Sequence, residues 1–481
     1  MKRTFVPIVM LSLLLALPVA MGAQAAKATF AVSAVKQPVV LKSAETISAA
    51  QLKDYLSFVA SDEMEGRADP SRGLDTTAKF IATMLSRAGI KPAGDDGTYF
   101  QKIALKKEKL AAEGTEVEIG AQKFAYGKDF LASPSGGSVS GAMIYAGDGW
   151  FVKAKNIDPY QGLDPKGKIV IVNQVAGLPP GLTINDLMTG KSGEDWIAPV
   201  TYAQKKGAIG VIALLPLLTQ ANPDTLETMR RSAEAGSFYP EKLPRSGAQL
   251  PTILANVRLA QAIFAKEQVN ANTILASFAA GTPVGTPVKP FELSADKKIR
   301  FAIRTTSETT TTQNVVAVVE GSDPVLKNEY VALGAHYDHT GTGNPINGDA
   351  IRNGADDDGS GTVALMAVAE ALAKAPRHPK RSILFVWHMG EEMGLWGSQY
   401  FTTFPTVPLD KVVAQLNIDM IGRSKAAGDT NPRDKNLSGP NELYVIGSKM
   451  MSTELGELSE AVNASYLKLS FNYKYDDPKD P

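Results

Sequence analysis

The sequence of 481 residues contains no cysteine, which excludes disulfides and cysteine-linked lipids and leaves stability to core packing. It has no excess of charge of either sign, because 50 lysine and arginine residues balance 50 aspartate and glutamate residues. A balanced chain lacks the basic surface with which proteins bind nucleic acid or an anionic membrane. Short tandem repeats and sustained heptads are also missing. The composition is therefore typical of an ordinary globular protein that binds neither nucleic acid nor membranes.

The most apolar run lies near the N-terminus and is too short for a membrane-spanning helix. Lys2 and Arg3 precede an apolar stretch at 9–16, and Ala23-Gln24-Ala25 is typical of a signal-peptide cleavage site. We expect residues 1–25 to be a signal peptide, so that the mature protein is exported to the periplasm or the extracellular space without a membrane anchor.

The chain is longer than one ordinary core, so it should form at least two domains. Residues 26–130 contain a helix with Ser48 as its N-cap and Gln51 as its capping-box partner, and form the N-terminal part of the main domain. Residues 131–285 contain short apolar strands at 168–172 and 208–214 but no histidine. We interpret this stretch as a separate inserted domain, mainly β, with residues 286–481 returning to the main domain.

Residues 286–481 alternate between apolar strands and a nearly all-apolar helix at 361–374. Strands are predicted at 314–320 and 329–335, joined like a hairpin, and further strands at 383–387 and 412–418. This order favours an α/β fold with a doubly wound, mixed sheet.

Three of these strands end at metal-ligand residue types, namely His336, the pair Glu391-Glu392, and Asp419. Asp356 lies in a Gly- and Asp-rich turn before the helix. Because sites in such sheets form beyond the carboxyl ends of the strands, these residues should meet at one edge. One histidine with several carboxylates suits a divalent cation, and one carboxylate can bridge two cations. Each signal is weak alone, since an isolated acidic pair is usually a solvated surface feature; their convergence carries the prediction.

Four ordered motifs resemble those of the di-zinc aminopeptidases of metallopeptidase family 28, and the resemblance covers nearly all of the mature chain. The N-terminal segments 61–67 and 91–95 are also similar to that family, and the middle block resembles an inserted protease-associated domain. The four motifs lie at 336–339, 354–361, 390–395 and 417–423.

The resemblance implies a zinc-dependent exopeptidase fold and a role for each matched residue. His336 and Asp419 would hold the first of two Zn²⁺ ions, Asp356 would bridge both, and Glu392 would hold the second. Glu391 would be the catalytic general base. The family's matching acidic pair is joined by a cis peptide, which predicts a cis bond within 356–357.

The resemblance implies that Asp338 orients His336 by contacting the imidazole nitrogen that does not bind the metal, as metal-bound histidines generally require. The family also has a histidine on the second zinc, in a segment after Asp419, but here no histidine follows His388. We therefore expect the second metal site to be incomplete and the C-terminal end of the fold to be missing. The alternative is a natural terminus with water or a nearby side chain such as His339 completing the site.

These observations predict an exported zinc metallopeptidase that removes residues from the N-terminus of peptide substrates. A dipeptide carboxypeptidase or a relative of the glutaminyl cyclases remains an alternative on the same fold. A non-catalytic binding protein is the third, although such a protein has no need of the base Glu391.

Overall fold

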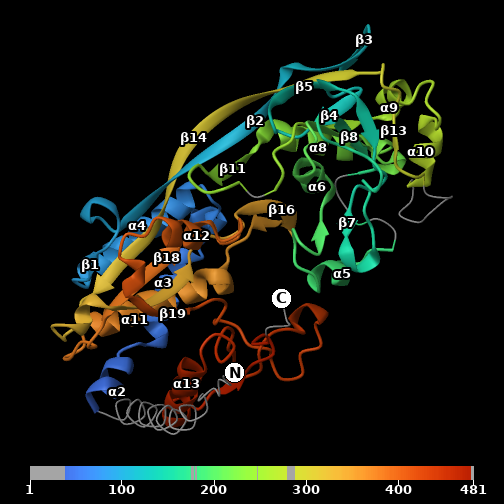
Figure 1. Ribbon diagram of the computed structural model, residues 1–481. Coiled ribbons are helices and arrows are strands. Elements are labelled where there is room, and N and C mark those ends of the chain that lie inside the picture. Colours follow the sequence, from blue (N-terminus) through green and yellow to red (C-terminus); the bar gives the residue numbers. More distant parts are fainter. Residues whose placement is uncertain (1–37, 175–177, 179–180, 246, 279–287, 478–481) are drawn as a thin grey trace, which may run out of the picture. The chain divides into compact units, whose positions relative to one another are not determined.

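The computed structural model describes residues 38–174, 178, 181–245, 247–278 and 288–477 (Figure 1). The expected signal segment 1–25 lies outside these residues. The described residues divide into two compact units: unit 1 comprises 38–103 and 311–477, and unit 2 comprises the described part of 104–310. The division falls within two long strands, β2 (Phe100–Ile119) and β14 (Ile299–Val319). A continuous strand has no turn residues to mark such a division, and the inserted domain at 131–285 stays a prediction.

Unit 1 is built on a mixed sheet in which β14, β18 (Ser382–His388), β15 (Tyr330–His336) and β19 (Val412–Asn417) lie side by side in that order. Strand β15 runs parallel to both β18 and β19, whereas β14 runs antiparallel to β18. The predicted mixed α/β sheet is confirmed. The predicted hairpin between β14 and β15 is wrong, because β18 lies between them.

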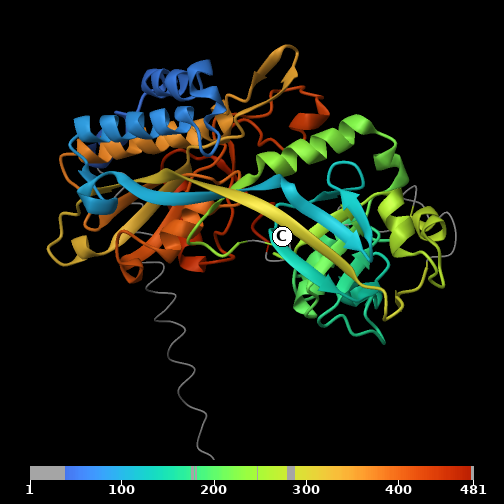
Figure 2. The same cartoon turned by 90° about the horizontal axis from the view of Figure 1, so that it is seen from above.

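Helices cover both faces of this sheet. Helix α11 (Gly361–Ala373) packs on one face with α3 (Ala49–Val59) and α4 (Arg72–Arg87), and Trp387 Nε1 donates to Thr362 O on that side (Figure 2). The alternate residues Leu384 and Val386 share a buried cluster with Phe401 of α12 (Trp396–Thr403). Because successive side chains of a strand point to opposite faces, α12 covers the other face. The sheet is therefore doubly covered.

Helix α3 begins where its sequence predicts, and its side chains fasten it to α11. Ser48 Oγ accepts a hydrogen bond from Gln51 N, as an N-cap does. The Gln51 side chain does not return to the cap; it donates to Glu370 Oε2 of α11, and Tyr55 Oη donates to Glu370 Oε1. This network replaces the expected reciprocal capping box and holds α3 and α11 together beside the Asp-rich turn.

The remaining helices and strands of unit 1 are short except for α13. They are α2 (Pro38–Ala44), β1 (Lys91–Pro92), β16 (Thr342–Ile346), β17 (Asp349–Ile351), β20 (Glu442–Tyr444), α13 (Thr453–Ser465) and β21 (Ser470–Asn472).

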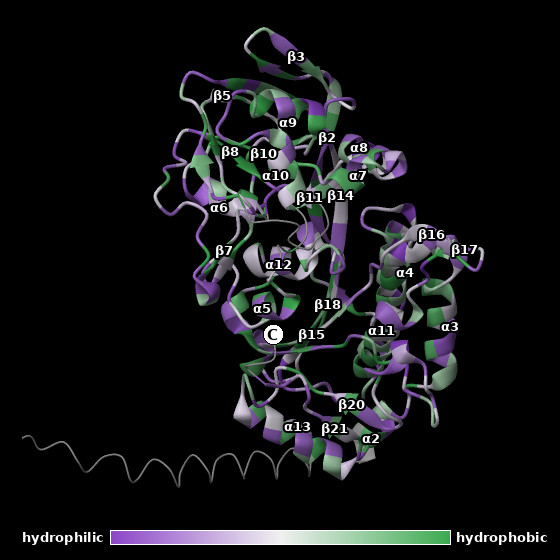
Figure 3. Cartoon of the chain, turned by 90° about the vertical axis from the view of Figure 1, so that its right-hand side faces the viewer, coloured by the Kyte–Doolittle hydropathy of each residue, from purple (hydrophilic) through white to green (hydrophobic). Residues whose placement is uncertain are grey.

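Unit 2 contains a second sheet, in the order β13-β6-β8-β10-β12-β4, whose four inner strands are parallel. Strands β8 (Ile169–Val172) and β10 (Gly210–Leu214) are buried along their whole length and apolar, as the sequence predicts (Figure 3). Parallel strands need crossover connections, and this unit accordingly contains helices beside its strands.

The other strands of unit 2 are β3 (Gln122–Ala125), β4 (Phe130–Ala132), β5 (Gly137–Gly141), β6 (Met143–Tyr145), β7 (Phe151–Val152), β9 (Trp196–Ile197), β11 (Ser237–Pro240), β12 (Thr252–Ala255) and β13 (Phe291–Glu292). Its helices are α5 (Ile184–Met188), α6 (Pro199–Lys205), α7 (Leu217–Gln220), α8 (Pro223–Ala235), α9 (Val257–Ile263) and α10 (Ala271–Ser277). Across the described part of the chain, none of the helices combines the length and apolarity needed to cross a bilayer.

Candidate metal centre

The parallel strands of unit 1 bring the predicted residues to one edge of the sheet. His336 is the last residue of β15 and is level with His388, the last residue of β18. The loop after β18 carries Glu391 and Glu392, and Asp419 follows β19, which pairs with β15 up to Asn417. This is the edge at which the carboxyl ends of parallel strands meet.

The first group of ligand-type atoms surrounds the imidazole of His336. Its Nε2 lies 3.1 Å from Asp357 Oδ1, 3.8 Å from Asp419 Oδ1 and 3.9 Å from Glu391 Oε2. The ring is only 2% exposed, and neither ring nitrogen makes a well-aligned hydrogen bond within the described residues. Buried polar atoms rarely lack a partner, and a cation held with Asp357 and Asp419 would supply one.

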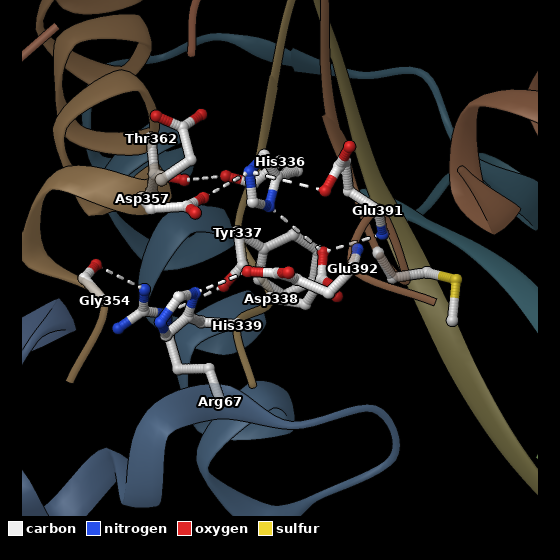
Figure 4. Close-up of polar contacts among 12 residues, drawn as sticks. Arg67, His336, Tyr337, Asp338, His339, Gly354, Asp357, Thr362, Glu391 and Glu392 are labelled. Carbon is white, nitrogen blue, oxygen red and sulfur yellow. Dashed lines mark hydrogen bonds and ion pairs between the residues drawn. The ribbon is translucent and has the colours of Figure 1, made fainter. Parts of the chain in front are cut away.

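The second group consists of His339, Asp357 and Glu392 (Figure 4). His339 Nδ1 lies 2.6 Å from Glu392 Oε1. In each group the ligand atoms lie within 4.8 Å of one another, and Asp357 is common to both. Imidazole nitrogen and carboxylate oxygen are both ordinary zinc ligands. The residues present therefore fit a metal at either position, with Asp357 between the two.

Asp357, and not Asp356, belongs to both groups, so the bridging role that the motif assigned to Asp356 stays a prediction, with Asp357 as the alternative. The Asp356 carboxylate faces the other way, and its Oδ1 accepts a hydrogen bond of 2.9 Å from Gly422 N. The non-proline cis peptide likewise joins Asp357 to Asp358, one residue later than expected. In a run of three aspartates the residue types are identical, so only the path of the main chain decides which carboxylate points inward.

Two further carboxylates orient the loops that carry the ligands. Asp338 accepts hydrogen bonds from Glu391 N and Glu392 N at 3.1 and 3.3 Å, and its Oδ1 lies 3.4 Å from His336 Nδ1. The predicted contact of Asp338 with His336 is present. The hydrogen bonds of Asp338 to the main chain of the Glu391 loop were not part of the prediction. Asp358, to which no motif assigned a role, accepts hydrogen bonds from Gly361 N and from Met420 N, next to Asp419.

Burial and crowding of carboxylates shape the electrostatics of this centre. Burial opposes protonation of His336, but the carboxylates of Asp338, Asp357 and Asp419 outweigh it and raise its pKa. Burial raises the pKa of Glu391 and raises that of Asp358 to about 8. Without a metal the imidazolium of His336 neutralises this cluster of negative charge; a divalent cation would do so more effectively.

His339 and Asp357 are the two residues of this centre that the motifs did not assign as ligands. The sequence placed His339 near the site, three residues after His336, but the family pattern gives that position no ligand role. The structure brings it into the second group because the 336–341 segment turns back beside the Glu391 loop. Of the remaining histidines, His388 packs against Phe401 and His378 contacts Glu320 O, so neither joins the centre.

A protein family matches the part of the chain that carries this centre. Residues 314–465 match the model of peptidase family M28. The probable leucine aminopeptidase 2 of Aspergillus oryzae is 31% identical over 173 residues, which are 35% of this chain and 31% of that protein. Leucine aminopeptidase 2 of Trichophyton equinum is 36% identical over 137 residues, which are 28% of this chain and 25% of that protein. The chain thus spans less than a third of the length of these relatives.

Among solved structures, the chain is similar to an aminopeptidase from Aneurinibacillus sp. strain AM-1, with a TM-score of 0.41, 17% identity, and coverage of 90% of this chain and 86% of that one. It is also similar to BSAP, a zinc aminopeptidase from Bacillus subtilis, with a TM-score of 0.40, 15% identity, and coverage of 88% and 79%. The family match over 314–465 contains every residue of the two metal groups. Residues 314–465, which carry the centre, therefore match peptidase family M28.

Proposed function

We propose that this protein is a zinc-dependent aminopeptidase that hydrolyses the N-terminal peptide bond of peptides. The observation that carries the proposal is the pair of ligand groups that share Asp357. Glu391 lies close to His336 but belongs to neither group, so its carboxylate is free to act as a base. The names of the relatives support the aminopeptidase direction, because the matched curated proteins are leucine aminopeptidases.

We assign one zinc to His336, Asp357 and Asp419, and a second to His339, Asp357 and Glu392. When bound by these residues, zinc would supply a Lewis acid for the scissile carbonyl and would lower the pKa of the attacking water. Glu391 then accepts the proton of the attacking water and returns it to the leaving amine. In the metal-free protein burial raises the pKa of Glu391. Asp338 holds the Glu391 loop through its two amide contacts.

The N-terminal segment 1–25 supports export as part of the proposal, and absence of that segment from the mature protein recovered outside the cytoplasm would test it. The substrate class is tested with aminoacyl p-nitroanilides, the same compounds blocked at the amino group, dipeptides cleavable only from the carboxyl end, and N-terminal glutaminyl peptides. We expect turnover of the free aminoacyl compounds alone. Turnover of the last substrates in place of the first would indicate the carboxypeptidase or cyclase alternative.

Metal dependence is tested on the same preparation. Exhaustive chelation should abolish turnover, and stoichiometric zinc should restore it. Full turnover in metal-free protein would contradict the proposal, and zinc binding without turnover of any of these substrates would favour a binding protein.

A further inference from the structure

Arg67 is a fully buried charged side chain that the proposed reaction does not use. It is 0% exposed and ends the short turn Asp62–Arg67, which links α3 to α4. The segment 61–67 is one of those by which the sequence resembles its family, yet it supplies no residue to either metal group. An arginine is rarely buried completely unless its guanidinium is fully hydrogen-bonded, so its contacts indicate what it does.

All four hydrogen bonds of the Arg67 side chain go to main-chain carbonyls of three separate segments. Nε donates to Tyr337 O at 2.9 Å. Nη1 donates to Val59 O at 2.6 Å and to Asn353 O at 2.7 Å. Nη2 donates to Gly354 O at 2.8 Å. The planar fork thus joins the end of α3 to two of the loops that carry the ligands (Figure 4).

The acceptors are direct neighbours of the metal groups along the chain. Tyr337 lies between His336 and Asp338, and Gly354 opens the turn that contains Asp357. The main chain of Arg67 adds a contact, because His339 N donates to Arg67 O at 3.1 Å. One residue is therefore bonded to the segments of His336, His339 and Asp357 at once.

The turn is fitted closely against these loops. Gly66 has φ +67°, and a Cβ there would lie 2.4 Å from Arg352 O and 2.5 Å from Gly341 O. Gly341 N also donates to Gly66 O. A main chain packed at this distance leaves little freedom for the 336–341 segment.

The charge of Arg67 is retained despite its burial. Burial lowers its pKa to about 10, while Asp338, Asp358 and other carboxylates of the centre oppose this decrease. An apolar side chain could fill the same space without desolvation of a charge. A buried cation beside a carboxylate cluster is instead suited to hold that cluster in place.

We propose that Arg67 is a positioning residue for metal binding, which fixes the 336–339 and 353–357 segments relative to each other so that their ligand atoms are preorganised for zinc. This inference rests on the proposed function, since it presumes that zinc binds there. A merely structural role would stabilise the fold equally with and without zinc. A positioning role adds stability that depends on zinc, because tighter binding to the native state raises the unfolding free energy.

The test compares Arg67→Met and Arg67→Lys with Arg72→Met in the full chain. Arg72 starts the next helix, and its side chain is 79% exposed and paired with Glu65. Zinc dissociation constants are measured by competition with a chromophoric chelator, and Tm is measured in chelator and in saturating zinc. We expect both Arg67 variants to bind zinc about 10–100-fold more weakly, the usual effect of losing a group that orients metal ligands. Their zinc-dependent rise in Tm should shrink, and Arg72→Met should match the wild type.

Arg67→Lys separates charge from geometry, because an ammonium cannot replace a fork that bonds three segments. Wild-type zinc affinity in this variant would overturn the proposal, as would a lower Tm in chelator with an unchanged zinc-dependent rise. Failure of both Arg67 variants to fold even in saturating zinc would also overturn it and make Arg67 a determinant of the fold. Absence of zinc binding by the wild type would instead refute the proposed function.

Discussion

His339 Nδ1 lies 2.6 Å from Glu392 Oε1, and both side chains approach the carboxylate of Asp357. The family pattern expects a histidine for the second zinc from a segment after Asp419, which this sequence does not contain. His339, three residues after the end of β15, is the histidine that groups with Asp357 and Glu392. The sequence predicts an incomplete second site, whereas this contact points to His339 as its histidine ligand. Measurement of bound zinc can test that assignment.

His339→Ala should reduce bound zinc from two equivalents to one, because Asp357 and Glu392 alone offer too few ligands for a tetrahedral site. His378→Ala is the matched control, since His378 contacts only a main-chain carbonyl among the described residues. Zinc is counted by mass spectrometry of metals after dialysis. Two tightly held equivalents in His339→Ala would show that His339 is not a ligand.

The adjacent glutamates should respond differently to the same substitution. Glu391→Gln should keep its zinc and lose turnover by about 10²–10⁴, because an amide cannot accept a proton from water. Glu392→Gln should lose zinc from the second position first. Parallel measurement of kcat and zinc content checks both, with exposed Glu113→Gln as the control. Equal zinc loss in the two variants would argue against separate roles.

Much of this centre could be predicted from the sequence because it depends on strand ends. An apolar run that stops at His336 or at the Glu391-Glu392 pair determines which edge of a parallel sheet receives those residues. The choice between Asp356 and Asp357 could not be made this way, because it depends on main-chain direction within a turn. Arg67 was equally inaccessible, since its partners are carbonyl groups far along the chain.

The fold likewise follows the sequence where contacts are local and departs from it where they are long-range. Helix α3 begins at its predicted cap because Ser48 acts on a neighbour three residues away. The insertion of β18 between β14 and β15 is a long-range pairing, and a short Gly- and Pro-containing connection imitates a hairpin in sequence. The limits of unit 2 show no turn residues in the sequence, because β2 and β14 continue through them without a break.

Asp357→Asn should lower zinc content at both positions, whereas Asp356→Asn should leave it near the wild-type value. Asparagine keeps the Oδ1 acceptor that Asp356 offers to Gly422 N, so the local hydrogen bond survives. At Asp357 it removes the charge common to both groups. The two variants are matched in chemistry and differ by one position. Greater zinc loss in Asp356→Asn would restore the original assignment from the motif.

Asp358 should make the metal-free protein less stable as pH rises. Burial raises its pKa to about 8, whereas in the unfolded chain an aspartate titrates near pH 4. Between these values the native state binds the extra proton, so the unfolding free energy decreases with increasing pH. The stability is fully present below about pH 4 and is lost as pH rises through about 8.

Asp358→Asn removes this titration while retaining an oxygen for Gly361 N and Met420 N. The unfolding free energy of the variant minus that of the wild type should therefore increase between pH 5 and 8. Urea unfolding in chelator at several pH values measures this difference, and a constant offset between the two proteins cancels from its slope. A difference that stays flat or decreases over this range would mean that Asp358 is already ionised in the native, metal-free state, with its charge balanced by His336.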